Sequence, residues 1–190
     1  MIIGEALFRK ADLSAYLRQQ VDAIGPHVRH NVNSGDLAKT DEELAAAMLP
    51  QALVAPIVID FNNPTKDVVE AQVTVNDLFS GRVQVSGVRV TKSFTFEGDR
   101  RLLDMRPSGW SNSPRATVGG NRIILGYEGR NEPQTIKDEL EREESSLREY
   151  VATSTRDIEA HNAKLPAMLK EAVAARRKQL IDIDNLKNAL

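Results

Sequence analysis

The last third of the chain carries an apolar stripe with a helical period. Isoleucine or leucine recurs every 11 residues, at Ile136, Leu147, Ile158, Leu169 and Leu180. Leu140 and Val151 keep the same step, one helical turn away. An 11-residue repeat corresponds to about 3.67 residues per turn, which is close to the period of an α-helix. The pattern therefore predicts a helical arm over residues 131–190 with one apolar face.

The stripe leaves two interpretations open. Either it contacts another chain, or it belongs to ordinary amphipathic helices that pack on the protein's own sheet. In the first case the oligomerisation candidates are Ile136, Leu140, Leu147, Val151, Ile158, Leu169 and Leu180. Pro166 either kinks one helix or separates two helices of a hairpin, because its ring meets the carbonyl of Asn162. Since no terminal Gly or Pro stops the pattern, we expect a continuation beyond Leu190 or a second chain that covers it.

A different period governs residues 57–96, where apolar and polar side chains alternate. The alternation is clearest from Val69 to Val75 and from Val83 to Val90. A period of two is typical of strands with one solvated face, which are usually antiparallel. The paired glycines Gly119-Gly120 predict a tight hairpin within residues 116–127. Because no helical pattern separates these strands, we expect an antiparallel sheet or a small sandwich.

The N-terminal residues read as helical. Apolar residues at steps of three and four predict an amphipathic helix over residues 7–31, and Thr40 with Glu43 forms a capping-box pattern for a second helix. The chain is thus predicted to be α+β. Its expected segments are a helical one (1–55), an antiparallel β domain (56–130) and the helical arm (131–190).

Composition excludes several classes of function. The chain has no cysteine, so disulfides, thiolate metal sites and cysteine nucleophiles are ruled out. Its net charge of −2 argues against a dedicated nucleic-acid binder, although a nucleic-acid partner is not excluded. No signal-peptide pattern and no membrane-spanning apolar run is present in the sequence, so we expect a cytoplasmic protein without a membrane partner.

No catalytic constellation stands out. His27 and His30 share a helical face but lack the further ligands of a metal site, so we interpret them as surface histidines. His161 is expected near a helix end, where it would interact with the helix dipole. Gly119-Gly120 lacks the strand-to-helix context of a phosphate loop. We therefore predict a protein that is not an enzyme, with no metal and no cofactor.

One basic loop has the composition of a binding site. It surrounds the single tryptophan and comprises Arg100, Arg101, Arg106, Trp110, Arg115 and Arg122. Arginine suits phosphates and carboxylates, and tryptophan is a common interface anchor. The loop could bind an anion, a nucleic-acid backbone or an acidic partner. Alternatively, its arginines pair with the acidic residues between Asp138 and Glu144.

Several short runs resemble a known group of proteins. The runs are Gly98–Ser108, Asn112–Ala116, Gly120–Leu125, Ala160–Pro166 and Ala175–Arg177. Over residues 55–190 the chain resembles the amino-terminal region of multidomain bacterial proteins of the antiphage-defence type. The resemblance implies a sensing or assembly region, followed by a nuclease-like or TIR-like effector domain.

These observations favour a non-catalytic regulatory module of bacterial defence. It would use the helical arm to form a homo-oligomer or to link to an effector domain. The alternative is a module that senses an anion or nucleic acid through the arginine-rich loop around Trp110.

Overall fold

The computed structural model describes residues 1–77, 81–109 and 112–190, and it shows an α+β fold. The chain divides into two compact units. The sheet unit comprises Met1–Leu13 and Pro56–Thr155, and the helical unit comprises Ser14–Ala55 and Arg156–Leu190. This division differs from the predicted segments, because the first 13 residues and the first part of the arm belong with the sheet.

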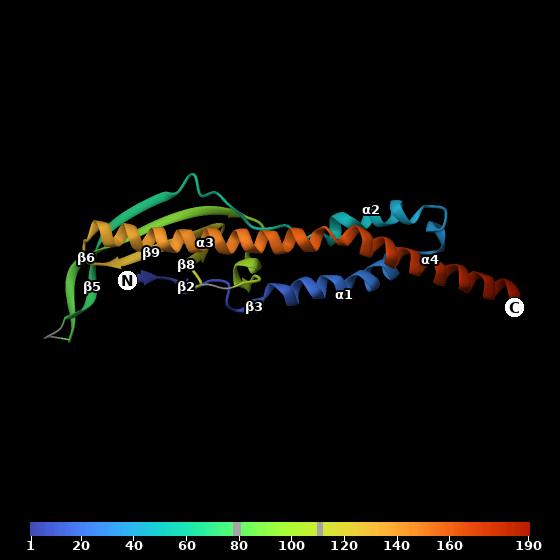
Figure 1. The fold of residues 1–190 in the computed structure, drawn as a ribbon, viewed down its shortest axis with the longest axis horizontal. Helices are drawn as coiled ribbons and strands as arrows, with labels where there is room; N and C mark the ends of the chain where they lie inside the picture. Colours follow the sequence, from blue (N-terminus) through green and yellow to red (C-terminus); the bar gives the residue numbers. More distant parts are fainter. Residues whose placement is uncertain (78–80, 110–111) are drawn as a thin grey trace. The chain divides into compact units, whose positions relative to one another are not determined.

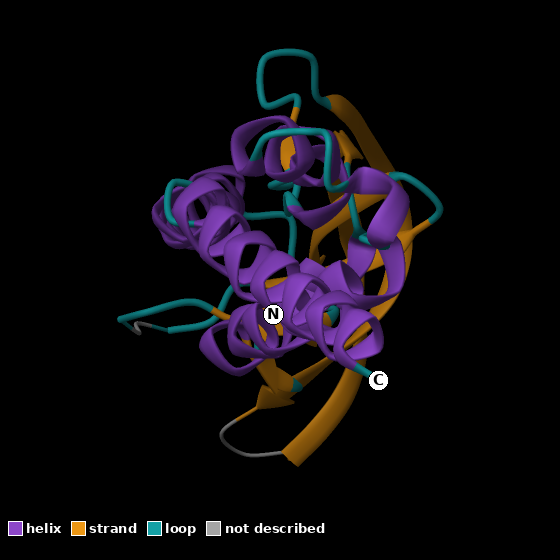
Figure 2. Cartoon of the chain, turned by 90° about the vertical axis from the view of Figure 1, so that its right-hand side faces the viewer, coloured by secondary structure: helices purple, strands orange, loops and turns teal. Residues whose placement is uncertain are grey.

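A mostly antiparallel sheet forms the sheet unit, as predicted (Figure 1). Its strand order is β2 (Glu5–Ala6), β8 (Arg115–Gly119), β9 (Arg122–Gly129), β6 (Gly81–Glu97) and β4 (Val58–Ile59). β1 (Ile2–Ile3) also pairs with β9, and β5 (Thr65–Asp77) pairs with β6. A separate parallel pair joins β3 (Ala11–Asp12) to β7 (Met105–Arg106), which follows the 3₁₀ turn η2 (Arg100–Asp104). The long strands lie in one curved layer (Figure 2).

The predicted hairpin between β8 and β9 is confirmed, with a small shift of its turn. Gly120 and Asn121 form the two-residue turn, and Gly120 has a φ of 58°. Gly119 instead ends β8, opposite Arg122. A positive φ is the conformation that the favoured hairpin turns require and that glycine adopts at little cost.

The sheet presents an apolar face to the first part of α3 (Pro133–Asn162). Phe94, Ile123 and Leu125 are fully buried on neighbouring strands, in register with one another. On α3, Ile136, Leu140 and Leu147 are buried as well. Hydrophobic burial on this face is the main force that holds the helix on the sheet.

The first residues form strands, whereas the sequence predicted a helix from residue 7. Leu7 and Phe8 are buried, and Phe8 adopts a φ of 56°. Its ring stacks on Tyr150 of α3 at 5.0 Å between centroids. This tertiary contact overrides local helix propensity, so α1 begins only at Leu13 and runs to Asn31.

The helical unit packs α1, α2 (Asp41–Ala52) and α4 (Leu165–Ala189) around one core. Its buried members are Ile24, Val28, Val32, Leu44, Ala45, Met48, Leu165, Leu169, Val173 and Leu180. The predicted capping box is confirmed: the Glu43 amide donates to Thr40 Oγ1, and the Thr40 amide donates to the Glu43 carboxylate. A 3₁₀ turn, η1 (Ser34–Asp36), connects α1 to α2.

The arm is a long helix bent at Ala163–Lys164 rather than a hairpin. Helical hydrogen bonds continue through the bend, from the Ala163 amide to the Glu159 carbonyl and from the Met168 amide to the Lys164 carbonyl. Pro166 lies in the first turn of α4, where its missing N–H costs little. Of the two interpretations of this proline, the kinked helix is therefore correct.

Candidate functional site

The five arginines of the predicted basic loop each have a different intramolecular partner. Arg100 donates to the Val118 carbonyl, Arg101 pairs with Asp99, Arg106 pairs with Asp12, Arg115 donates to the Gly4 carbonyl and Arg122 donates to Thr65 Oγ1. These partners come from separate strands and turns, so each guanidinium group is held by a partner within the chain. Trp110, the proposed anchor, lies outside the described residues.

Side chains of α3 do contact this loop, but they bind backbone groups of the loop and not its arginine side chains. The Arg115 amide donates to the Glu143 carboxylate at 2.7 Å, and Ser146 Oγ donates to the Asn112 carbonyl at 2.7 Å. These bonds fix the loop to the helix. The alternative prediction, in which the arginine side chains themselves pair with Asp138–Glu144, is not what these contacts show.

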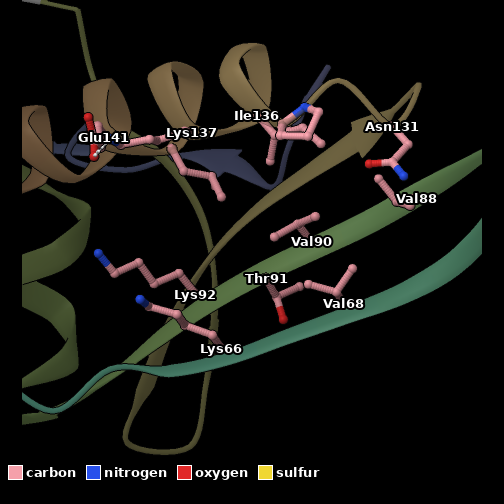
Figure 3. A pocket seen from close by; sticks show the side chains of 12 residues that line it. Lys66, Val68, Val88, Val90, Thr91, Lys92, Asn131, Ile136, Lys137 and Glu141 are labelled. Carbon is pink, nitrogen blue, oxygen red and sulfur yellow. Dashed lines mark ion pairs between the residues drawn. The ribbon is translucent and has the colours of Figure 1, made fainter.

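A groove of about 450 Å³ lies where α3 covers the β5–β6 hairpin (Figure 3). Valines from the two strands form its floor, Ile136 and Leu140 of α3 form one wall, and lysines stand at its edge. We call it the α3 groove; its lining is Lys66, Val68, Val88, Val90, Thr91, Lys92, Asn131, Pro133, Ile136, Lys137, Leu140 and Glu141. Volumes of this size are usual for small-molecule sites.

Strand register explains why these side chains share one face. Lys66 lies opposite Lys92, and Val68 lies opposite Val90. Residues two apart on a strand point to the same side, so the lysine pair and the valine pair follow one another along the groove. Val68 is 63% exposed, although its neighbour across the strands is partly buried.

Two lysines directly opposite each other repel, and the structure compensates only one of them with a carboxylate. Lys92 forms an ion pair with Glu144 of α3, and Glu144 also accepts from Arg148 at 2.7 Å. Burial alone would raise the pKa of Glu144, but the hydrogen bonds from Lys92 and Arg148 outweigh it and hold that pKa below its usual value. Within the described parts of the chain, Lys66 has no ion pair.

On the α3 side of the groove, the lysine is paired with a carboxylate. Lys137 extends from α3 toward the strands in Figure 3 and pairs with Glu141 at 3.8 Å. Both side chains are well exposed, so this pair contributes little to stability. The excess positive charge of the groove therefore lies at the end with Lys66 and Lys92, because Glu144 pairs with Lys92 and is shared with Arg148.

The histidines differ from their prediction in part. His161 is buried, and its Nε2 has no hydrogen-bond partner within the described structure. Burial, and secondarily the Lys164 ammonium, lower the pKa of His161, so the ring favours its neutral form instead of acting as a cation at the helix end. His27 and His30 lie on α1. Over residues 1–77, 81–109 and 112–190, no cluster of three or more His, Asp or Glu side chains could hold a metal ion.

The predicted oligomerisation stripe is largely covered by the chain itself. Ile136, Leu140, Leu147, Ile158, Leu169 and Leu180 are buried, and Val151 is partly buried. A second apolar set was not predicted: Ile181, Ile183 and Leu186 are exposed further along α4, and Leu190 is exposed directly after it. Spacings of three and four among the last three residues were the signal that could have revealed this face.

No family model, curated protein or solved structure matches the chain. The resemblance to amino-terminal regions of antiphage-defence proteins thus stays a prediction. None of the helices in the described part of the chain is long and apolar enough to cross a bilayer.

Proposed function

We propose that the chain is a non-catalytic assembly module that pairs with a second copy of itself through the end of α4. The observation that carries this proposal is the exposure of Ile183 (48%) and Leu186 (62%) on one face of α4, and of Leu190 (100%) directly after it at helical spacing. We call these three residues the distal stripe. Exposed apolar side chains at this spacing are typical of helix–helix interfaces.

The charges beside the distal stripe favour a second copy as the partner. Asp182 and Asp184 precede Leu186, and Lys187 follows it. In a parallel pair that brings the two distal stripes together, Asp182 and Lys187 lie on opposite sides of the stripe, so Lys187 of one copy faces Asp182 of the other. The same segment thus supplies both the apolar surface and the complementary charges, as a two-fold interface requires.

The burial of the preceding stripe supports this division of roles. Leu169 and Leu180 help to form the core of the helical unit, so they are not available to a partner without unfolding. The distal stripe lies beyond that core and is free to associate. The predicted role in bacterial defence would be consistent with such a module, because an amino-terminal region of that kind assembles or regulates an effector.

The test is the solution mass of the chain over a concentration series, measured by light scattering. We expect a dimer whose population rises with concentration, and a monomer for the variant Leu186→Asp. Ile181→Asp is the matched control, because Ile181 is 45% exposed on the opposite side of the same helix. A monomer at every concentration, or an equal loss of mass for both variants, would refute the proposal.

Orientation can be tested separately because the chain has no cysteine. The variant Leu190→Cys should form a covalent dimer on mild oxidation if the pair is parallel, because identical positions of the stripe then face each other. In an antiparallel pair that places Ile183 against Leu186, the two positions would be about 16 Å apart along the axis, too far for a disulfide. A dimer by mass that fails to cross-link would contradict the proposed register but not the assembly itself.

A further inference from the structure

We infer that the α3 groove binds a single-chain amphiphile with a carboxylate head, with its hydrocarbon tail on the valine floor and its head at Lys66 and Lys92. This site lies in the sheet unit and involves no residue of the distal stripe. The inference is therefore independent of the assembly role.

The apolar lining of the groove indicates that the ligand has a hydrocarbon tail. Val68, Val88 and Val90 come from the strands, and Ile136 faces them from α3 (Figure 3). Leu140 of α3 also lines the groove. Val68 is 63% exposed, so a tail lying there would remove apolar surface from water. Valine is usually buried in a strand that a helix covers, and the open groove explains why this one is not.

The length of the groove sets the length of the tail. Val88 and Lys92 are four residues apart on β6, a span of about 13 Å in a strand. C–C bonds of about 1.5 Å at tetrahedral angles advance roughly 1.25 Å per carbon. The apolar floor therefore accommodates about ten carbons in an extended chain.

The charges at one end of the groove indicate the head group of the ligand. Lys66 and Lys92 lie opposite each other, and their amino groups point the same way in Figure 3. Glu144 pairs with Lys92, whereas Lys66 has no carboxylate partner among the residues described. A carboxylate placed between the two ammonium groups would relieve their repulsion and form charge-assisted hydrogen bonds.

The dimensions argue against a protein helix as the occupant. An α-helix with its side chains is about 10 Å across, so a single turn would occupy about 420 Å³ and leave no room in the groove for a second turn. An acidic amphipathic helix would also need a longer apolar surface than the floor provides. A slender chain with one anionic end fits both the volume and the charge.

Calorimetric titration of the whole chain with saturated carboxylates of increasing length tests the tail. We expect each added methylene to tighten binding about fourfold up to about ten carbons, and longer tails to gain little. Val68→Trp should fill the groove and weaken decanoate binding at least tenfold. Val69→Trp is the matched control, because Val69 is the next residue, lies on the opposite face of β5 and is also exposed.

Charge variants test the head. Lys66→Glu should weaken decanoate binding by about tenfold or more, since hydrogen bonds to a charged group contribute about 1.5–3 kcal/mol. Arg82→Glu, an exposed charge reversal nearer the tip of the same hairpin, should leave binding unchanged. Decyltrimethylammonium, which has the same tail and a cationic head, should bind at least tenfold more weakly than decanoate.

Four outcomes would overturn the inference. The first is that decanoate does not bind at millimolar concentration. The second is that decanoate and decyltrimethylammonium bind equally, which would mean unspecific apolar adsorption. The third is that Val69→Trp weakens binding as much as Val68→Trp. The fourth is that an acidic amphipathic peptide binds in the groove while free carboxylates do not.

Discussion

Asn162, the last residue of α3, forms two hydrogen bonds to the backbone of Val54, in the segment that follows α2. Its Oδ1 accepts from the Val54 amide at 3.1 Å, and its Nδ2 donates to the Val54 carbonyl at 2.8 Å. Val54 is buried, so neither of its backbone groups can turn to water if Asn162 is truncated. We expect Asn162→Ala to lower the free energy of unfolding by about 2–4 kcal/mol, because each unsatisfied buried group costs about 1–3 kcal/mol.

Guanidinium denaturation followed by far-UV circular dichroism measures this loss. Asn31→Ala is the matched control, because Asn31 also donates to a backbone carbonyl, that of His27 at 2.8 Å, but in an exposed position. It should cost under about 0.5 kcal/mol. Asn162→Asp keeps the acceptor but places a carboxylate beside the Val54 carbonyl, so it should destabilise at least as much as Asn162→Ala. Equal, small losses for Asn162→Ala and Asn31→Ala would refute the reasoning.

Four further substitutions test other parts of the fold. Thr40→Ala removes the capping box of α2 and should cost about 1 kcal/mol in denaturant unfolding, with no loss if the cap is unimportant. Gly25→Ala should raise the melting temperature, because Gly25 lies inside α1 with no atom within 4 Å of an added Cβ, whereas Gly4→Ala should lower it, because that Cβ would lie 2.5 Å from the Ala116 backbone. The pKa of His161 is lowered in the folded state, so its contribution to stability is complete above the ordinary value of 6.5 and is lost as the pH falls from there through the lower folded-state pKa. His161→Gln should flatten the decline of unfolding free energy below pH 6.5, and an unchanged slope would show that His161 does not cause it.

The sequence predicted those elements that depend on local patterns. Period-two alternation identified the strands because the long strands have one covered face and one solvated face. Thr40 and Glu43 identified a helix start because a capping box satisfies backbone donors within four residues. Pro166 located the bend of the arm, although only the structure could choose between a kinked helix and a hairpin.

Features that depend on contacts distant in sequence were not predictable in the same way. The first residues lack a strand pattern of their own, and they form β1 and β2 because β9 and β8 offer them partners. The arginines around Trp110 looked like one site because they are close in sequence. In the fold they attach to separate strands and turns. The α3 groove could not be predicted, because Lys66 and Lys92 become neighbours only through the register of β5 on β6.

The helix α4 carries two apolar sets that its sequence pattern does not distinguish. Leu169 and Leu180 continue the 11-residue stripe and are buried, whereas Ile183, Leu186 and Leu190 continue at spacings of three and four and are exposed. Since both sets would read as one apolar face, periodicity alone assigns them the same role. Burial separates them: substitution of the first set removes core contacts of the helical unit, so its primary effect must be on folding. Substitution of the distal stripe removes no core contact, so a change in solution mass there at constant melting temperature would identify an interface.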